Sequence, residues 1–321
     1  MTGMSDTTQV LADLRWLLLS PPLWSDAVLS TFAGDDPALS IQRFEQPQLL
    51  AIETWLDELA EASEAADAIA ALNSLVKQNR LGRYAEQLLW FYLAYGPVHR
   101  LLAHNLVIKN PPARAGGTAQ TVRGEVDFLL TDAAADYWHW ELAVKYFLCE
   151  APTLEAQVDD FVGPEGVETM RLKLEKLFGR QLRQPIPPPW DQHHWQRGAF
   201  ARGRIFYPLG RAPATCASLA TDHCRGWWLP QNEIDLLADD VFMTLPRLRW
   251  LAPVVCRDDA TLLKGRRAVT DALLSTDAPR DPACPPTPVL LARLRWHDED
   301  GQDGQWQTGH WRELDRGFIV S

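Results

Sequence analysis

The chain has 321 residues, of which 46% are hydrophobic and 23% charged, and its formal net charge at pH 7 is −11. These values predict a globular protein with a sizeable core, and they exclude nucleic-acid binding over the whole surface, so any such site must be a local patch. No apolar run reaches the roughly 20 residues of a membrane helix, and no basic segment with a cleavable apolar core opens the sequence, so we expect a cytoplasmic protein without membrane contact. The five cysteines form no Cys-x-x-Cys pair, which argues against a disulfide framework and a structural zinc site.

The N-terminal region, residues 1–78, is predicted to be helical. Asp6 is a good N-cap residue and apolar side chains recur at helical spacing after it, so we expect a helix over residues 6–19 that Ser20-Pro21-Pro22 ends. After a loop, a second helical region begins near Leu49. It continues through the alanine-rich, acidic run from Glu58 to Ala71, which we interpret as a helix with a solvated outer side.

A helix and a strand are predicted next, over residues 81–95 and 101–108. Gly96-Pro97 separates them, because proline cannot continue a helix. The helix carries one acid among apolar neighbours, Glu86, which either faces the strands that follow or pairs with Arg83 or Arg100 on the helix surface. Residues 110–123 are rich in Pro, Gly and Arg, so we expect a loop that is able to touch a ligand.

Residues 124–150 predict an antiparallel hairpin, because two runs rich in β-branched and aromatic residues flank a short polar link. Side chains alternate across a strand, so the polar residues of both strands share one face: Glu125, Asp127, His139, Glu141 and Lys145. A turn centred near Ala134 places Asp127 opposite Glu141. It also places Glu125 opposite Ala143, so three carboxylates and one lysine converge.

Carboxylates that oppose each other on a sheet repel, unless a cation lies between them. A hard divalent cation such as Mg²⁺ (or Mn²⁺) binds one or two carboxylates and completes its shell with waters and substrate phosphates. A nearby lysine then positions the attacking water or stabilises developing charge. The alternative interpretation is a solvated hairpin face with ordinary surface charges.

Beyond the hairpin, residues 151–167 predict a loop that closes near the site, and residues 168–182 predict an amphipathic helix. Its expected inner side is apolar: Leu172, Leu174, Leu177 and Phe178. Its expected outer side is basic: Arg171, Lys173, Lys176 and Arg180. This basic face either follows a phosphate backbone or serves solubility. Gln181 bonds a base edge, a site carboxylate or neither.

The last part, residues 213–321, is predicted to be rich in strands that extend or cover the sheet. A strand is expected before this part, over residues 201–209, and further strands are expected within it, over 226–229 and 248–255, with a short helix over 234–245. Arg202 and Arg204 are expected on the polar face of the first of these strands. A proline-rich segment at 184–194 should be extended, and a linker at 279–288 leads to a terminal hairpin made by residues 288–296 and 304–311. Residues 318–320 are expected to dock the tail.

Three features together resemble the PD-(D/E)xK nuclease superfamily, which has the restriction-endonuclease-like fold. They are a helix that carries a glutamate, a strand that ends near an asparagine, and a Gly-Glu-x-Asp segment that opens a hairpin whose second strand carries a glutamate and a lysine. A wider set of segments is similar to a bacterial group, domain-of-unknown-function family 1853: Leu81-Gly82-Arg83-Tyr84 with Glu86, GEVDFLL, HWELAVKYFL, FVGP at 161–164 and Gln181-Leu182. The resemblance implies an α/β fold, with a mixed central sheet flanked by helices and its core at residues 79–212.

The resemblance also implies roles for individual residues. Asp127 would be the metal-binding aspartate, Glu141 the second carboxylate, Lys145 the catalytic lysine and Glu86 the accessory acid. The superfamily expects an acid two residues before the lysine, where this chain has Ala143. Glu141 lies four residues before it, which on an extended strand is roughly 13 Å rather than about 6.6 Å. A migrated acid, a β-bulge or use of Glu125 as the second ligand restores a metal site, and loss of catalysis is the remaining alternative.

We therefore expect Mg²⁺-dependent hydrolysis of phosphodiester bonds in a nucleic acid, with DNA favoured. The expected metal ligands are Asp127, Glu141 and Glu125. The expected nucleic-acid contacts form a local patch: Arg123, Arg171, Lys173 and Gln181. The competing hypothesis is a catalytically inactive protein of the same fold that binds nucleic acid or a protein partner.

Overall fold

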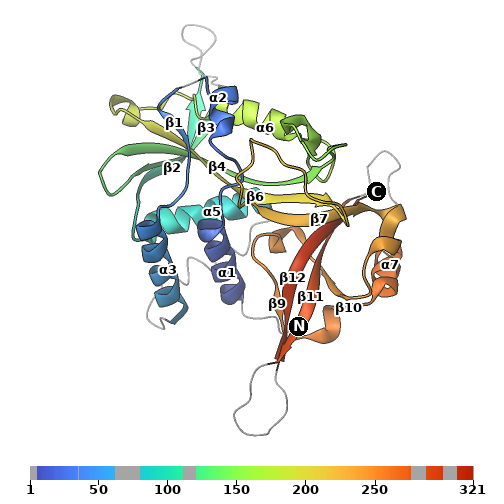
Figure 1. The fold of residues 1–321 in the computed structure, drawn as a ribbon. Coiled ribbons are helices and arrows are strands. Elements are labelled where there is room, and N and C mark those ends of the chain that lie inside the picture. The colour runs from blue at the N-terminus through green and yellow to red at the C-terminus, as the bar shows by residue number, and fades with distance from the viewer. Residues whose placement is uncertain are drawn as a thin grey trace.

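Twelve strands form one mixed β-sheet in the computed structural model, which describes residues 6–34, 36–61, 80–110, 121–275, 287–298 and 309–320 (Figure 1). The main path through the sheet has the order β10-β8-β11-β12-β7-β6-β4-β3-β2, and β1, β5 and β9 pair with strands beside this path. The strands are β1 (Leu39–Ile41), β2 (Arg100–Lys109), β3 (Val122–Thr131), β4 (Tyr137–Cys149), β5 (Phe161–Val162), β6 (Gln196–Pro208), β7 (Cys224–Pro230), β8 (Val241–Thr244), β9 (Val255–Cys256), β10 (Leu263–Lys264), β11 (Val289–Asp298) and β12 (Gly309–Val320).

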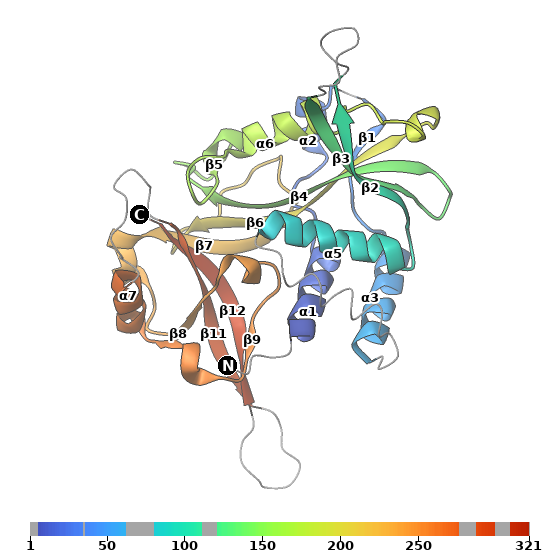
Figure 2. The same cartoon turned by 180° about the vertical axis from the view of Figure 1, so that it is seen from behind.

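Helices cover both faces of the part of the sheet that contains β4, so the expectation of an α/β protein with a mixed sheet flanked by helices is confirmed (Figures 1 and 2). On one face lie α1 (Asp6–Leu19), α3 (Gln46–Glu61) and α5 (Leu81–Tyr95). On the other face lie α2 (Ala27–Phe32) and α6 (Met170–Lys176), and α7 (Arg266–Ser275) packs farther along the C-terminal strands. The bounds predicted for α1 and α5 agree with the structure, because the proline or glycine at each C-terminal end is a local signal.

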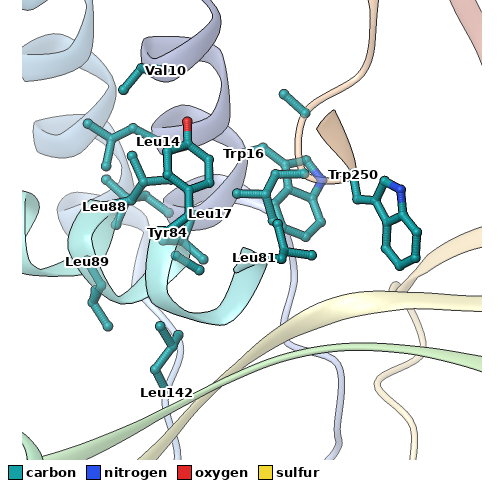
Figure 3. Packing of buried hydrophobic residues seen from close by; sticks show 14 of the residues in the cluster. Val10, Leu14, Trp16, Leu17, Leu81, Tyr84, Leu88, Leu89, Leu142 and Trp250 are labelled. Atoms are coloured by element: carbon teal, nitrogen blue, oxygen red, sulfur yellow. The ribbon is translucent and has the colours of Figure 1, made fainter. Parts of the chain in front are cut away.

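The first face is held by an apolar cluster between α1, α5 and the sheet. Leu14 and Leu17 of α1 pack against Tyr84 and Leu88 of α5, and Leu142 of β4 lies beneath them (Figure 3). Alternation along β4 sends its neighbours Ala143 and Phe147 to the opposite face, where they join a second cluster with α6 and the turn that follows it: Met170, Leu174, Leu177 and Phe178. Both faces of β4 are therefore buried, as expected for a central strand.

Strand β4 changes partner along its length. At its start it pairs antiparallel with β3, from Tyr137 opposite Thr131 to Trp140 opposite Phe128. Along its other edge it pairs in parallel with β6, from Trp138 to Leu148. At its end Leu148 and Cys149 pair with β5. Between these two antiparallel contacts, the edge of β4 on the side of β3 has no strand partner among the described residues, because β3 turns away with β2.

Several expectations for the C-terminal part are wrong. The helix predicted over 234–245 is a 3₁₀ turn, Gln231–Leu236, followed by β8. The strand predicted over 248–255 begins in the 3₁₀ turn Arg247–Arg249, continues without helix or strand, and reaches β9 only at Val255. Apolar spacing misled both predictions, because Leu237 and Phe242 fill one core cluster while Trp250 and Leu251 fill another without regular structure. The helix α7 was not predicted. A terminal hairpin of β11 and β12 is present and extends the sheet, but its second strand is Gly309–Val320, so the expected bounds 304–311 are wrong and residues 318–320 belong to this strand.

Arg202 is also not on a polar face. Its side chain is only 1% exposed, and Nε donates to the carbonyl oxygen of Leu17 at 3.2 Å, at the C-terminal end of α1 where a cation is favourable. In the segment 184–194, which was expected to be extended, residues Trp190–Gln192 form a 3₁₀ turn. Four of the expected segments lie wholly or partly outside the described residues: the acidic run beyond residue 61, the loop over residues 111–120, the linker up to residue 286 and the turn at 299–308.

Candidate carboxylate site at the fork of the hairpin

Asp127 and Glu141 lie where β3 and β4 separate. The last ladder pair is Phe128 opposite Trp140, so the predicted register is confirmed and these two acids occupy the next positions along each strand. Asp127 Oδ2 accepts a hydrogen bond from the backbone N–H of Leu142 at 3.0 Å, and the Asp127 backbone N–H donates to Glu141 Oε1 at 3.4 Å. Each carboxylate therefore binds the backbone of the opposite strand at the point where the ladder ends.

Glu141 is completely buried within a polar network. Its Oε1 is 2.9 Å from His139 Nε2, and its Oε2 accepts from Gln181 Nε2 at 2.8 Å. Gln181 Oε1 in turn accepts from Lys173 Nζ at 3.1 Å. Burial lowers the pKa of His139 to about 4, so its ring is neutral at pH 7 and the geometry assigns its proton to Nε2, facing Glu141. Two elements, β4 and the end of α6, thus hold the Glu141 carboxylate in one orientation.

Three groups of the site have pKa values close to neutral pH. Burial and then the charge of Glu141 raise the pKa of Asp127 to about 7, and burial raises the pKa of Glu141 to about 7. Burial, followed by the charge of Lys145, lowers the pKa of Lys173 to about 8. Groups that titrate near pH 7 are suited to proton transfer and to cation binding, and strongly perturbed groups gather at functional sites.

The expectation that Lys173 lies on the outer side of its helix is wrong, since only 6% of this residue is exposed. Leu172, expected inside, is 54% exposed. The helix begins at Met170 with Thr169 as its cap, and Lys173 lies three residues after Met170 and four before Leu177, on the buried stripe. This spacing was the signal in the sequence that would have identified it.

Gln181 reaches the site through an irregular turn. Helix α6 ends at Lys176 and continues as a π-helical turn, Leu177–Gln181, in which the N–H of Leu182 bonds the carbonyl oxygen of Leu177 at 2.9 Å. A π-turn widens the helix by one residue and is frequent at functional sites. Of the three roles left open for Gln181, the structure shows the bond to a site carboxylate.

Lys145 lies beside this network without a hydrogen bond to either acid. Its Nζ is 2.5 Å from Glu168 Oε2, and after burial its charge has the largest effect in lowering the pKa of Lys173. Across the ladder it faces Gly203, where an added Cβ would lie 1.8 Å from the Lys145 carbonyl oxygen. The position two before it, Ala143, is 2% exposed and packs in the core, so it contributes no polar group to the site.

Both interpretations of Glu86 hold in part. Arg83 Nη1 donates to Glu86 Oε2 at 3.2 Å, as in the surface alternative. Burial and then the charge of Asp127 raise the pKa of Glu86, with a smaller contribution from Glu125, so the acids of β3 also act on Glu86. Glu125 pairs with Val107 of β2, and the expected position opposite Ala143 is wrong because β3 has already left β4.

Two of the expected nucleic-acid contacts have protein partners outside the network. Arg171 forms a two-point ion pair with Asp159, with Nε to Oδ1 at 2.5 Å and Nη2 to Oδ2 at 2.6 Å. The side chain of Arg123 is exposed, and its carbonyl oxygen accepts from Arg180 Nη2 at 3.0 Å. The network at the fork therefore contains Lys173 and Gln181 but neither of these two arginines.

The donor set at the fork fits a hard divalent cation of the kind that uses one or two carboxylates. Asp127 and Glu141 supply oxygen ligands, and burial raises the pKa of both, so two negative charges are costly here without a cation. No group of three or more His, Cys, Asp and Glu side chains that would enclose a metal exists in the described part of the chain. Waters and substrate oxygens would have to complete the coordination shell.

Comparison with known protein families gives a match to the family described as "Domain of unknown function (DUF1853)", over residues 12–320. The chain belongs to this family. The DUF1853 chain matches no curated protein and no solved structure. Among the described helices of the DUF1853 chain, none is long and apolar enough to cross a membrane.

Proposed function

We propose that the DUF1853 chain is a metal-dependent nuclease that hydrolyses phosphodiester bonds, with DNA as the favoured substrate. The observation that carries the proposal is the pairing of Asp127 with Glu141 at the fork, next to a buried lysine, Lys173. Two acids from adjacent strands and a lysine are the groups that the resemblance to the PD-(D/E)xK superfamily leads one to expect. The mixed sheet with helices on both faces supports the same fold.

In this proposal Asp127 and Glu141 hold Mg²⁺ or Mn²⁺, which when bound polarises a phosphate and lowers the pKa of a water. His139 and Gln181 fix the orientation of Glu141, so that its position does not have to be organised during the reaction. Glu141 thereby takes the place of the acid that the superfamily has where this chain has Ala143. It lies next to Asp127 because the strands face each other there, although it is distant from Lys145 along β4.

Lys173 is the stronger candidate for the lysine role. It is connected to Glu141 through Gln181, whereas Lys145 is bound to Glu168. With a pKa of about 8, Lys173 is able to orient a water in its charged form or accept a proton in its neutral form near neutral pH. Lys145, beside it, adds positive charge for a phosphate.

A second candidate function is binding without turnover. It is favoured by the occupation of both Glu141 oxygens by protein donors and by the ion pair that occupies Lys145. In a protein of this kind the network would only stabilise the fork, and the fold would present a surface to nucleic acid or to a protein partner.

The test is cleavage of branched, single-stranded and duplex DNA with Mg²⁺ or Mn²⁺. We expect the parent to cut at least one substrate, and Asp127→Asn and Lys173→Met to lose at least about 100-fold in rate. Lys176→Met, an exposed lysine on the same helix, is the matched control and should cut like the parent. Binding without cutting by the folded parent would favour the second function, and full activity of Asp127→Asn would place the activity elsewhere.

A further inference from the structure

A charged cleft lies along the unpaired edge of β4, beyond the carboxylate pair. It has a volume of about 540 Å³, and Val144, Lys145 and Tyr146 of β4 form part of its wall. Residues 163–168, directly after β5, form another part, and Arg80 and Arg247 line it as well. The cleft exists because β3 and β5 each pair with only one end of this edge of β4 and leave its middle open.

The cations of the cleft face two acids on one tight turn. Lys145 Nζ contacts Glu168 Oε2 at 2.5 Å, and Arg247 Nη2 contacts Glu165 Oε1. Arg80 makes no ion pair with the residues that the structure describes. The turn at 163–168 is closed by bonds from Gly163 N–H to the carbonyl oxygen of residue 168 at 2.6 Å and from Gly166 N–H to that of residue 163 at 2.8 Å. One turn therefore carries both carboxylates, and each of them contacts a cation of the cleft.

These ion pairs are exchangeable. The side chains of Lys145 and Glu168 are 27% and 40% exposed, and those of Arg247 and Glu165 are 49% and 51% exposed. Ion pairs at this exposure add little to stability and weaken with salt. A phosphodiester carries the same single negative charge as a carboxylate and likewise offers two free acceptor oxygens, so it is able to replace either glutamate against these cations. The two glutamates thus occupy positions that suit two phosphates.

The cleft lies near the candidate site, because its residue Lys145 and the site residue Glu141 are four positions apart on the same face of β4. Lys145 belongs to the cleft, and its charge acts directly on Lys173 of the buried network. A DNA strand that lay in the cleft would follow β4 from Arg247 towards the fork, where Asp127 and Glu141 lie.

We propose that this cleft binds the phosphodiester backbone of a DNA strand through Arg80, Lys145 and Arg247, and that Glu165 and Glu168 occupy the phosphate positions in the free protein. The choice of DNA rests on the proposed function. The turn at 163–168 then competes with the substrate, so that DNA must displace two carboxylates before it reaches the fork.

The test is the affinity for fluorescently labelled single-stranded DNA, measured by anisotropy in EDTA so that metal-dependent cleavage does not occur. The double variant Glu165→Gln/Glu168→Gln should bind roughly 5- to 10-fold more tightly than the parent, because two competing ion pairs are lost. The control Asp26→Asn/Asp57→Asn removes two other ion-paired surface acids and the same charge, and it should change affinity less than about twofold. Arg247→Ala should weaken binding several-fold and reduce the salt dependence by about one phosphate contact.

The proposal is overturned if the Glu165/Glu168 variant binds no more tightly than the control variant, or if Arg247→Ala binds DNA like the parent. These outcomes are separate from those of the nuclease test. A parent that cuts DNA, together with a Glu165/Glu168 variant of unchanged affinity, refutes only the cleft. A parent that does not cut, together with a variant of increased affinity, supports the cleft and refutes only the nuclease.

Discussion

Asp127→Asn should stabilise the metal-free protein above neutral pH. The pKa of Asp127 is raised from 3.8 to about 7, so the folded state keeps a proton that the unfolded chain has already released between these values. Stability is therefore lost progressively as the pH rises from about 4 to about 7, and the loss is complete above that range. Asparagine carries no charge and is free of this loss. Its side-chain oxygen is also able to accept the hydrogen bond of the Leu142 N–H.

The magnitude follows from the shift. About three pKa units at ~1.4 kcal/mol each set an upper limit of ~4 kcal/mol. The proton is shared with a second acid, Glu141, and the site relaxes when charged, so we expect a gain of about 1–3 kcal/mol in the free energy of unfolding at about pH 8. In a chain of this size that is a rise of a few °C in melting temperature. At about pH 4 the two proteins should be nearly equally stable.

The assay is urea unfolding in EDTA at about pH 8 and about pH 4. Asp159→Asn is the control with the opposite sign, because its hydrogen bond to Arg171 lowers the pKa of Asp159 and the variant should lose a little stability at the higher pH. If Asp127→Asn is less stable than the parent by the same amount at both pH values, Asp127 acts only as the acceptor for the Leu142 N–H, and the argument from its raised pKa is refuted.

Three further outcomes are expected. Mg²⁺ in about 100-fold excess over its Kd should stabilise the parent by ~2.7 kcal/mol and leave Asp127→Asn unchanged in urea unfolding, and equal shifts in both would exclude metal binding at the fork. Lys173→Met should lower the free energy of unfolding by about 1–3 kcal/mol, because Gln181 Oε1 loses its donor and the acids lose a cation. Lys176→Met should change it by no more than about 0.5 kcal/mol, and similar losses in the two variants would contradict the burial argument. Gly203→Ala should lower the free energy of unfolding by ~3 kcal/mol or more, because the new Cβ would lie 1.8 Å from the carbonyl oxygen of Lys145. Gly82→Ala, where the new Cβ has no atom within 4 Å, should be neutral or stabilising. A Gly203→Ala variant as stable as the parent in thermal melting would refute this.

The sequence by itself determined the elements whose signals are local. Alternation in the two strands, together with one short turn, was enough for the hairpin and for the register that brings Asp127 to Glu141, because a shift by one residue would turn every side chain to the other face. Helical spacing and the Gly96-Pro97 stop were enough for the bounds of α5. The identity of the two central acids therefore followed from pattern alone.

Only the tertiary structure decided where the hairpin opens and which basic residue enters the site. The strands separate after Phe128 because β3 stays with β2 while β4 stays with β6, a competition between pairings that no single segment encodes. Lys173 is buried because α6 packs this side of the helix against the second apolar cluster, and Gln181 reaches Glu141 through the π-helical turn. These partners are distant in sequence: the spacing of Lys173 from Met170 and Leu177 indicates the buried side of α6, but it does not indicate that this side faces Glu141.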